Sequence, residues 1–275
     1  MQIAVLSGKG GAGKTLLAVN LANLIEGSTF LDCDVEEPNG VFYFADTYNK
    51  EEVYTKIPVI NDHLCKHCNK CVDFCRYNAL IDFLGKVKVL PSLCHSCGGC
   101  QLVCPHGAIK EKDELLGYIN YTSVRDHKIF GGELRIGKET GVSIIEKILA
   151  KANTNEDSVI DCPPGNGCSV MESISDADYC VLVSEPTVFG LENLKMVYDL
   201  TKIYKKKSGI VINKAVEDNG LVEAYAKEIH IPILGYIPFD KNLALSNSKL
   251  EMVSNGAFKS YFDHVLNRIK KEVSI

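Results

Sequence analysis

The fold is decided by eight residues near the N-terminus, Gly8-Lys9-Gly10-Gly11-Ala12-Gly13-Lys14-Thr15. They fit the pattern G-x-x-x-x-G-K-S/T and lie between a strand-like run at residues 2–7 and an apolar helical run at residues 15–25. Glycines let successive backbone N–H groups turn inward around a phosphate, and the N-terminus of the following helix adds its dipole. Lys14 would reach the β- and γ-phosphate oxygens, and Thr15 could hold Mg²⁺. The sequence therefore predicts a nucleotide site at this loop.

Strands and helices alternate along most of the chain. Further strand-like runs occur at residues 29–33, 158–161, 179–184, 209–212 and 233–237, and helical runs at 141–152, 191–204, 220–229 and 259–271. Strands that are apolar along their whole length are typical of a parallel sheet covered by helices on both faces. Segments 117–121 and 128–136 alternate like a short hairpin. We therefore predict an α/β fold with a mostly parallel sheet flanked by helices.

Composition narrows the class of protein. The chain has 275 residues, of which 46% are hydrophobic, and a formal net charge of −5. This charge provides no overall positive field for nucleic acid or an anionic membrane, and no apolar run approaches the roughly 18 residues of a spanning helix. We expect a cytoplasmic protein with no nucleic-acid partner and no stable membrane insertion. The last helical run has an apolar face that should pack on the sheet, with a membrane-seeking helix as the disfavoured alternative. This face comprises Phe258, Tyr261, Phe262, Val265, Leu266 and Ile269.

Two carboxylates follow predicted strands. Asp34 comes just after the run at residues 29–33, and Asp161 ends the run at residues 158–161. The carboxyl ends of parallel strands face the ligand crevice, where one carboxylate can orient attacking water and another can hold metal-bound water. Asp32 points to the opposite face of its strand and is the weaker candidate. Thr15, Asp34 and Asp161 therefore form the predicted Mg²⁺ site.

The loop resembles the deviant Walker A of a class of P-loop ATPases that includes MinD, Mrp and the nitrogenase iron protein. The resemblance rests on the second lysine, Lys9, in the order K-G-G-x-G-K-T, and on the two aspartates. It implies that Lys9 reaches across a dimer to the partner's nucleotide, that Asp34 is the switch I aspartate and that Asp161 is the switch II, or Walker B, aspartate. The implied catalytic residues are Lys9, Lys14, Asp34 and Asp161, and the implied partner is a second copy or a similar ATPase.

The bound base can also be argued from the sequence. Asn213-Lys214 begins like a guanine reader, yet Val216 stands where a carboxylate would have to accept the N–H groups of guanine. The sequence therefore favours ATP over GTP. The resemblance further implies that Asn213 contacts the adenine edge and that the loop carrying Pro238 packs on the base.

Eight of the twelve cysteines form two runs with the same spacing, C-x2-C-x2-C-x3-C. The second run repeats the first 29 residues later, so the segment is an internal duplication. Three thiolates crowded into one loop suit three irons on one face of a 4Fe–4S cubane, whereas tetrahedral zinc more naturally takes two ligands from each of two knuckles. Zinc and disulfides are the disfavoured alternatives. The runs comprise Cys65, Cys68, Cys71, Cys75, Cys94, Cys97, Cys100 and Cys104.

The duplicated runs resemble a bacterial two-cluster ferredoxin, in which the fourth cysteine of each run serves the other cluster. The resemblance assigns one 4Fe–4S cluster to Cys65, Cys68, Cys71 and Cys104, and the other to Cys94, Cys97, Cys100 and Cys75. Arg76 stands where a proline usually follows the first run, while Pro105 retains it. We expect a ferredoxin-like α+β domain at residues 61–114, inserted into an ATPase domain at residues 1–60 and 115–275.

The other cysteines and the charges around the runs are weighed separately. Cys33 and Cys180 lie in strands and are expected in the core. Cys168 follows Asp161 by seven residues, the displacement of a bridging-cluster cysteine in the nitrogenase iron protein, but no cysteine lies between Cys104 and Cys162 to complete such a cluster. Cys168 is therefore an accessory thiol candidate only. A locally basic face, either solvated or docking an acidic redox partner, comprises Lys66, His67, Lys70, Arg76 and His95.

Three functions are compatible with these features, all of them using ATP, Mg²⁺ and two 4Fe–4S clusters. In the first and favoured one, the ATPase dimer cycle gates electron transfer through the clusters to a redox partner. In the second, the chain is an Mrp-like carrier that delivers clusters to an apo-iron–sulfur protein, although it lacks a C-terminal C-x-x-C. In the third, it is a MinD-like binding switch whose clusters sense redox state.

Overall fold

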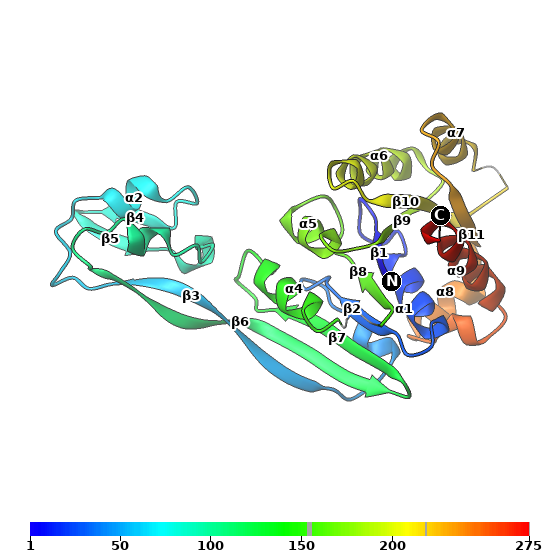
Figure 1. The fold of residues 1–275 in the computed structure, drawn as a ribbon, viewed down its shortest axis with the longest axis horizontal. Helices are drawn as coiled ribbons and strands as arrows, with labels where there is room; N and C mark the ends of the chain where they lie inside the picture. Colours follow the sequence, from blue (N-terminus) through cyan, green and yellow to red (C-terminus); the bar gives the residue numbers. More distant parts are fainter. Residues whose placement is uncertain (153–155, 218, 275) are drawn as a thin grey trace.

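The computed structural model describes residues 1–152, 156–217 and 219–274. Within them, a nine-stranded sheet has the order β11-β10-β9-β1-β8-β2-β7-β6-β3 (Figure 1). Neighbours from β11 to β7 pair in parallel, which confirms the predicted α/β class, and β6 and β3 pair antiparallel. The strands are β1 (Gln2–Leu6), β2 (Thr29–Asp32), β3 (Asn49–Ile60), β6 (Ile109–Val124), β7 (His127–Leu134), β8 (Ser158–Asp161), β9 (Tyr179–Ser184), β10 (Lys207–Ala215) and β11 (Ile233–Pro238).

Helices cover both faces of the parallel part because its strands are apolar on both faces. Ile3 and Val5 pack against α1 and α9, whereas Ala4 and Leu6 face the core formed with α4 to α7. The helices are α1 (Lys14–Leu24), α4 (Val142–Leu149), α5 (Cys168–Ile174), α6 (Val188–Ile203), α7 (Gly220–Glu228), α8 (Lys241–Ser248) and α9 (Lys259–Val273). Short 3-10 turns occupy Gly40–Tyr43 and Val253–Asn255. None of the helices in the described residues has the length and apolar character to cross a membrane.

The face of α9 largely follows the prediction. Phe262, Val265, Leu266 and Ile269 are buried in the core, and Phe258 packs against it. Tyr261 is the exception, because it is 39% exposed. Tyr261 thus lies at the margin of the apolar stripe, where its side chain reaches solvent.

A long two-stranded ribbon carries the cysteine runs away from the sheet. β3 and β6 pair from Asn49 opposite Tyr121 to Ile60 opposite Ile109 (Figure 1). The predicted hairpin exists as β6 and β7, but β6 begins at Ile109 rather than at residue 117. No local pattern predicted β3, because its first half is charged and Pro58 interrupts the second.

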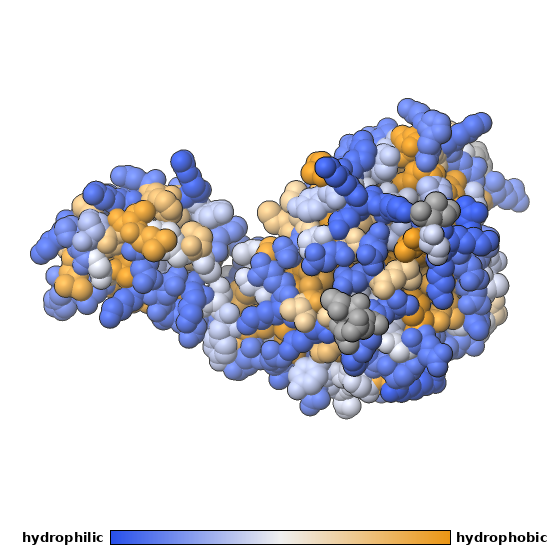
Figure 2. Space-filling model, viewed as in Figure 1, coloured by the Kyte–Doolittle hydropathy of each residue, from blue (hydrophilic) through white to orange (hydrophobic). Residues whose placement is uncertain are grey.

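The far end of the ribbon holds a small lobe, residues 61–108, with its own core, to which Ile109 of β6 contributes. Ala79, Leu80, Val87, Cys100 and Ile109 are buried together. Figure 2 shows the lobe joined to the main body by a narrow waist. The lobe contains α2 (Lys70–Phe74), a hairpin of β4 (Leu80–Phe83) and β5 (Lys86–Val89), a 3-10 turn (Pro91–Leu93) and α3 (Gly99–Leu102).

Candidate functional site: a phosphate loop and a cysteine lobe

The glycine-rich loop connects β1 to α1 at the carboxyl edge of the sheet. Gly11 (φ 74°) and Gly13 (φ 100°) adopt the left-handed conformation that glycine tolerates best. Gly13 also has no room for a side chain, because an added Cβ would lie 2.0 Å from Nδ2 of Asn213. Lys14, the first residue of α1, is buried. The sequence thus shapes this turn through both backbone conformation and close packing.

Asn213 braces the loop from β10. Its Nδ2 donates a hydrogen bond to the carbonyl oxygen of Ala12 at 2.8 Å, and its side chain is buried. Pro238 ends the neighbouring β11 and lies opposite Ala215 in the register of the two strands. The structure therefore brings both predicted base-contact residues to the carboxyl edge, with the amide nitrogen of Asn213 engaged by the loop itself.

Lys9 is held by a carboxylate that sequence reasoning missed. Glu185 follows β9, is 8% exposed, and accepts from Lys9 Nζ and from Lys214 Nζ, each at 2.5 Å. Burial acts to raise the pKa of Glu185, but the hydrogen bonds from Lys214 and Lys9 outweigh it and hold the pKa below its usual range. The Lys9–Glu185 ion pair must break before the Lys9 ammonium can contact a phosphate. Only the position of Glu185 directly after an apolar strand could have indicated it.

Asp161 and Asp34 lie beside Lys14. Asp161 is fully buried, and neither carboxylate oxygen accepts a hydrogen bond of standard geometry from the described residues. Burial raises its pKa to about 7, against the lowering effects of Thr15 and Lys14. Burial likewise raises the pKa of Asp34 to about 6, while Lys14 lowers it. Two buried carboxylate oxygens that accept no hydrogen bond of standard geometry within the described residues, beside the hydroxyl of Thr15, are a donor set that suits Mg²⁺.

Asp32 has a structural role. Its Oδ1 accepts from the backbone N–H of Asp34, and its Oδ2 accepts from the N–H groups of Asn39 and Gly40. These bonds fix the turn that follows β2. Asp32, the weaker of the two candidates on sequence, thus shapes the segment that carries Asp34.

The raised pKa values predict a pH-dependent affinity for Mg²⁺-ATP. A carboxylate must lose its proton to hold the metal, so affinity should fall by about tenfold as pH drops from 8 to 6 through the pKa of Asp161. Titration of the protein with Mg²⁺-ATP across this range would measure it. Asp161→Asn should flatten the profile, and ATP titrated with EDTA should show a weaker dependence. A wild-type profile as flat as that of the variant would contradict the metal role.

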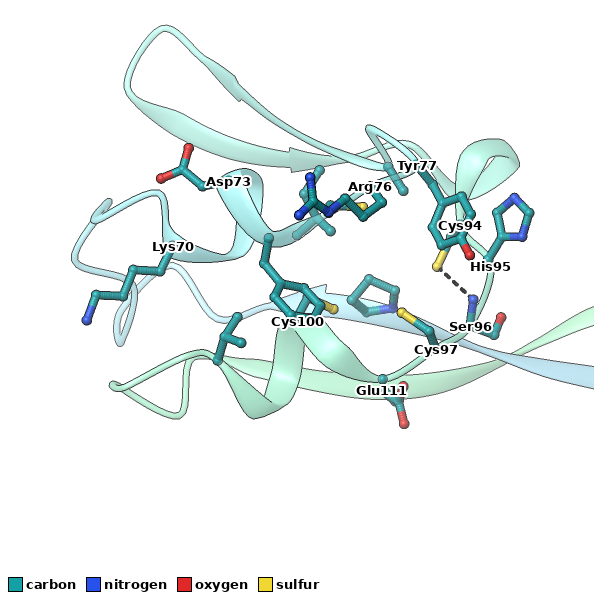
Figure 3. A pocket seen from close by; sticks show the side chains of 17 residues that line it. Lys70, Asp73, Arg76, Tyr77, Cys94, His95, Ser96, Cys97, Cys100 and Glu111 are labelled. Atoms are coloured by element: carbon teal, nitrogen blue, oxygen red, sulfur yellow. Dashed lines mark hydrogen bonds between the residues drawn. The ribbon is translucent and has the colours of Figure 1, made fainter.

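The cysteines of the lobe line two cavities. One is lined by Cys65, Cys68, Cys71 and Cys104, and the other by Cys75, Cys94, Cys97 and Cys100 (Figure 3). The pKa values of the thiols reflect the same grouping. Burial raises the pKa of Cys71, and the nearby thiols of Cys104 and Cys65 raise it further. Burial also raises the pKa of Cys94; a backbone hydrogen bond from Ser96 lowers it, and the nearby thiols of Cys97 and Cys75 raise it. Each cavity therefore combines three thiols of one run with the fourth of the other.

The four thiols around each cavity are a donor set that could hold a 4Fe–4S cluster. In the described residues, no three His, Cys, Asp or Glu side chains are grouped closely enough to hold one ion. Tetrahedral zinc draws its sulfurs to about 2.3 Å from the metal, whereas a cubane spreads its four ligands over four irons. All twelve cysteines are free thiols. Four thiols line each of the two cavities, which is the number of ligands that a 4Fe–4S cluster takes.

The duplication is also visible in the residues that follow each fourth cysteine. Pro105 lines the first cavity and Arg76 the second, so the proline-to-arginine departure lies beside the second set of thiols. Tyr77 stacks on His95 at the edge of this cavity, with 3.7 Å between ring centroids (Figure 3). The basic residues predicted around the runs, Lys66, His67, Lys70, Arg76 and His95, are all exposed.

The remaining four cysteines lie in the main body. Cys33, Cys162 and Cys180 are buried, and burial is the main cause that raises their pKa values. A buried thiol with a raised pKa is a poor nucleophile, which agrees with the core role predicted for Cys33 and Cys180. Cys168 is exposed at the start of α5, far along the chain from both cysteine runs.

Comparisons with known proteins find matches that span most of the chain. The family model "CobQ/CobB/MinD/ParA nucleotide binding domain" matches residues 3–252. An uncharacterized protein of Methanocaldococcus jannaschii, MJ0578, is 33% identical and covers 98% of this chain and 97% of its own. The "iron-sulfur cluster carrier protein" of Methanococcus maripaludis is 26% identical over 98% of this chain and 86% of its own. The cell division ATPase MinD of Pyrococcus furiosus has a similar fold, with a TM-score of 0.60, 15% identity and 98% of each chain covered.

Proposed function

This chain belongs to the CobQ/CobB/MinD/ParA family of nucleotide-binding domains, and on that basis we propose that it couples an ATPase dimer cycle to electron transfer through two 4Fe–4S clusters. The proposal combines an ATP-binding fold of the MinD type with the cysteine lobe. It includes a dimer, formed with a second copy or a similar ATPase, and a redox partner protein.

One observation carries the proposal. The lobe with two four-thiol cavities is inserted between Asp34 and Asp161, the two carboxylates that flank the phosphate loop. When bound, a 4Fe–4S cluster would supply one-electron chemistry at each cavity. Any movement of the segment at Asp34 on nucleotide binding acts on the same stretch of chain that leads into β3 and the lobe.

Different residues of the main body are proposed to bind the phosphates, the Mg²⁺ ion and the adenine of ATP. In this proposal, backbone N–H groups of the loop and the Lys14 ammonium bind the phosphates, and Thr15, Asp34 and Asp161 hold Mg²⁺ and order water. In the single chain, Glu185 holds Lys9 in an ion pair. Release of Lys9 toward a partner's phosphate would complete the site only in the closed dimer. Asn213 and Pro238 are proposed to flank the adenine.

Oxidation rates test the coupling. Protein loaded and reduced under anaerobic conditions should reduce a one-electron acceptor dye faster with ATP than with ADP, by about tenfold if closure exposes or repositions the lobe. Lys14→Ala should show the slow rate with either nucleotide. Equal wild-type rates in all nucleotide states would contradict gating.

Cluster delivery is the second candidate, favoured by the 26% identity to the iron–sulfur cluster carrier protein of Methanococcus maripaludis. The two candidates differ in the fate of the iron. If the chain transfers electrons, its iron should stay bound when it is mixed with an apo-ferredoxin and ATP. Iron that moves to the apo-ferredoxin in proportion to ATP turnover would support delivery instead.

A further inference from the structure

The two four-thiol cavities differ in how they relate to the main body. The residues that line the first cavity all lie between Ile60 and Ile109, within the lobe and the end of its ribbon. Beside the second set of thiols, a cleft is shared between the lobe and the body. Its walls include Pro91, Cys94 and Ser96 on one side and Lys138, Thr140 and Ser143 on the other. Cys94 of the second set thus lines a cleft whose opposite wall belongs to the body.

A continuous series of contacts leads from Asp34 to this cleft. Val35, the next residue, is buried against Gly132 and Gly141, where an added Cβ would lie 2.4 and 2.3 Å from its methyl groups. The carbonyl oxygen of Val35 also accepts from the N–H of Leu134 at 2.8 Å. Movement at Asp34 would therefore displace both ends of the loop that joins β7 to α4.

That loop is tied to the base of the lobe. The N–H of Arg135 donates to the carbonyl oxygen of Leu116 at 3.0 Å, and Lys138 forms an ion pair with Glu114. Leu116 and Glu114 both lie in β6. The exposed fractions of the Lys138 and Glu114 side chains are 12% and 25%, so solvent screens this pair less than an open surface pair. Displacement of the loop is thus passed to the ribbon beside Thr55, which pairs with Glu114.

The last step reaches a cluster ligand. Thr55 Oγ1 and Ser96 Oγ are 2.6 Å apart, and the backbone N–H of Ser96 donates to Cys94 Sγ at 3.4 Å (Figure 3). Hydrogen bonds to the sulfurs are among the determinants of the reduction potential of an iron–sulfur cluster. At the equivalent place in the first run, His67 is exposed on the lobe, with its Nδ1 3.9 Å from Cys65 Sγ.

We propose that Ser96, held by Thr55, is a positioning residue through which movement of the segment at Asp34 changes the reduction potential of the second cluster. ATP then shifts the potential of the cluster at Cys75, Cys94, Cys97 and Cys100 and leaves the cluster at Cys65, Cys68, Cys71 and Cys104 unchanged. This inference rests on the proposed function and deepens it, because it names the responding cluster and the contacts that reach it.

Linkage provides a test through binding rather than activity. If ATP shifts the potential of a cluster, reduction must change the affinity for ATP by the same free energy. We expect the wild-type affinities of oxidised and reduced protein to differ by about tenfold, which corresponds to about 59 mV for one electron. Ser96→Ala removes the hydroxyl that contacts Thr55 and keeps the backbone N–H. In this variant the ratio of the ATP affinities of oxidised and reduced protein should therefore fall toward one. Ser96→Thr should restore the wild-type ratio, and the matched control His67→Ala should retain it.

Potentials of the separate clusters complete the test. Iron content and the ATP affinity of the oxidised protein should be the same in Ser96→Ala, Thr55→Val and the wild type, which shows that the fold is intact. A nucleotide shift that resides in the first cluster, or that persists fully in Ser96→Ala and Thr55→Val, would overturn the role of this contact. No redox dependence of ATP affinity in the wild type would instead overturn the proposed function on which it rests.

Discussion

Lys14→Ala is expected to abolish tight ATP binding. Lys14 is buried at the first position of α1, where its ammonium would neutralise phosphate charge in a site with little access to solvent. Removing one partner of a buried charge pair costs about 2–5 kcal/mol, and 3 kcal/mol is more than a hundredfold in affinity. Equilibrium titration with a fluorescent ATP analogue would measure the loss.

Lys9→Ala is the matched control for this variant. Lys9 is 35% exposed and pairs with Glu185 in the single chain, so its loss should leave ATP affinity within a few-fold of the wild type. Hydrolysis should nevertheless be lost, because the proposed phosphate partner of Lys9 belongs to the opposite subunit. Equal loss of binding in the two variants would contradict separate roles for the two lysines.

Removal of Cys104 is expected to halve the iron content. Two four-iron sites give about eight irons per chain after anaerobic reconstitution, and loss of one ligand set should leave about four. Iron and sulfide analysis with EPR spectra would follow the change. Cys168→Ala should retain about eight irons, because that residue lies outside both cavities. Stoichiometric zinc without iron–sulfur absorption would contradict the cluster assignment as a whole.

Two double variants test the crossed ligation directly. Cys104 and Cys71 line the same cavity, so Cys104→Ala with Cys71→Ala should still retain about four irons. Cys104 and Cys100 line different cavities, so Cys104→Ala with Cys100→Ala should retain almost none. The reverse order of iron contents would show that each run binds its own cluster.

The features predicted best from sequence are those fixed by local chemistry. The phosphate loop is specified by glycines that a strand-to-helix turn requires. The bounds of β8 and β9 agree with the predicted strands, and both strands are buried along their whole length. Cys104 and Cys71 line one cavity, as the ferredoxin-like spacing leads one to expect, and their binding of a common cluster stays a prediction. In each case the residues that define the feature lie close together in the chain or in a repeated pattern.

Features that depend on distant partners were not predicted. β3 is charged at its start, and its pairing with β6 joins residues as far apart as Asn49 and Tyr121. The side-chain roles of Glu185 and Asp32 depend on which lysines and backbone N–H groups the fold brings to them. Likewise, the contact of Ser96 with Thr55 joins the lobe to the ribbon and has no signal in the spacing of the cysteines.

The midpoint potentials of the clusters in different nucleotide states test the account most directly. They should be recorded with no nucleotide, with ADP and with a non-hydrolysable ATP analogue, alongside EPR spectra of the reduced protein. Coupling free energies between two sites are typically about 1–3 kcal/mol, so at least one potential should shift by some tens of millivolts with the ATP analogue. Identical potentials and spectra in all three states would contradict the coupling of ATP binding to the clusters.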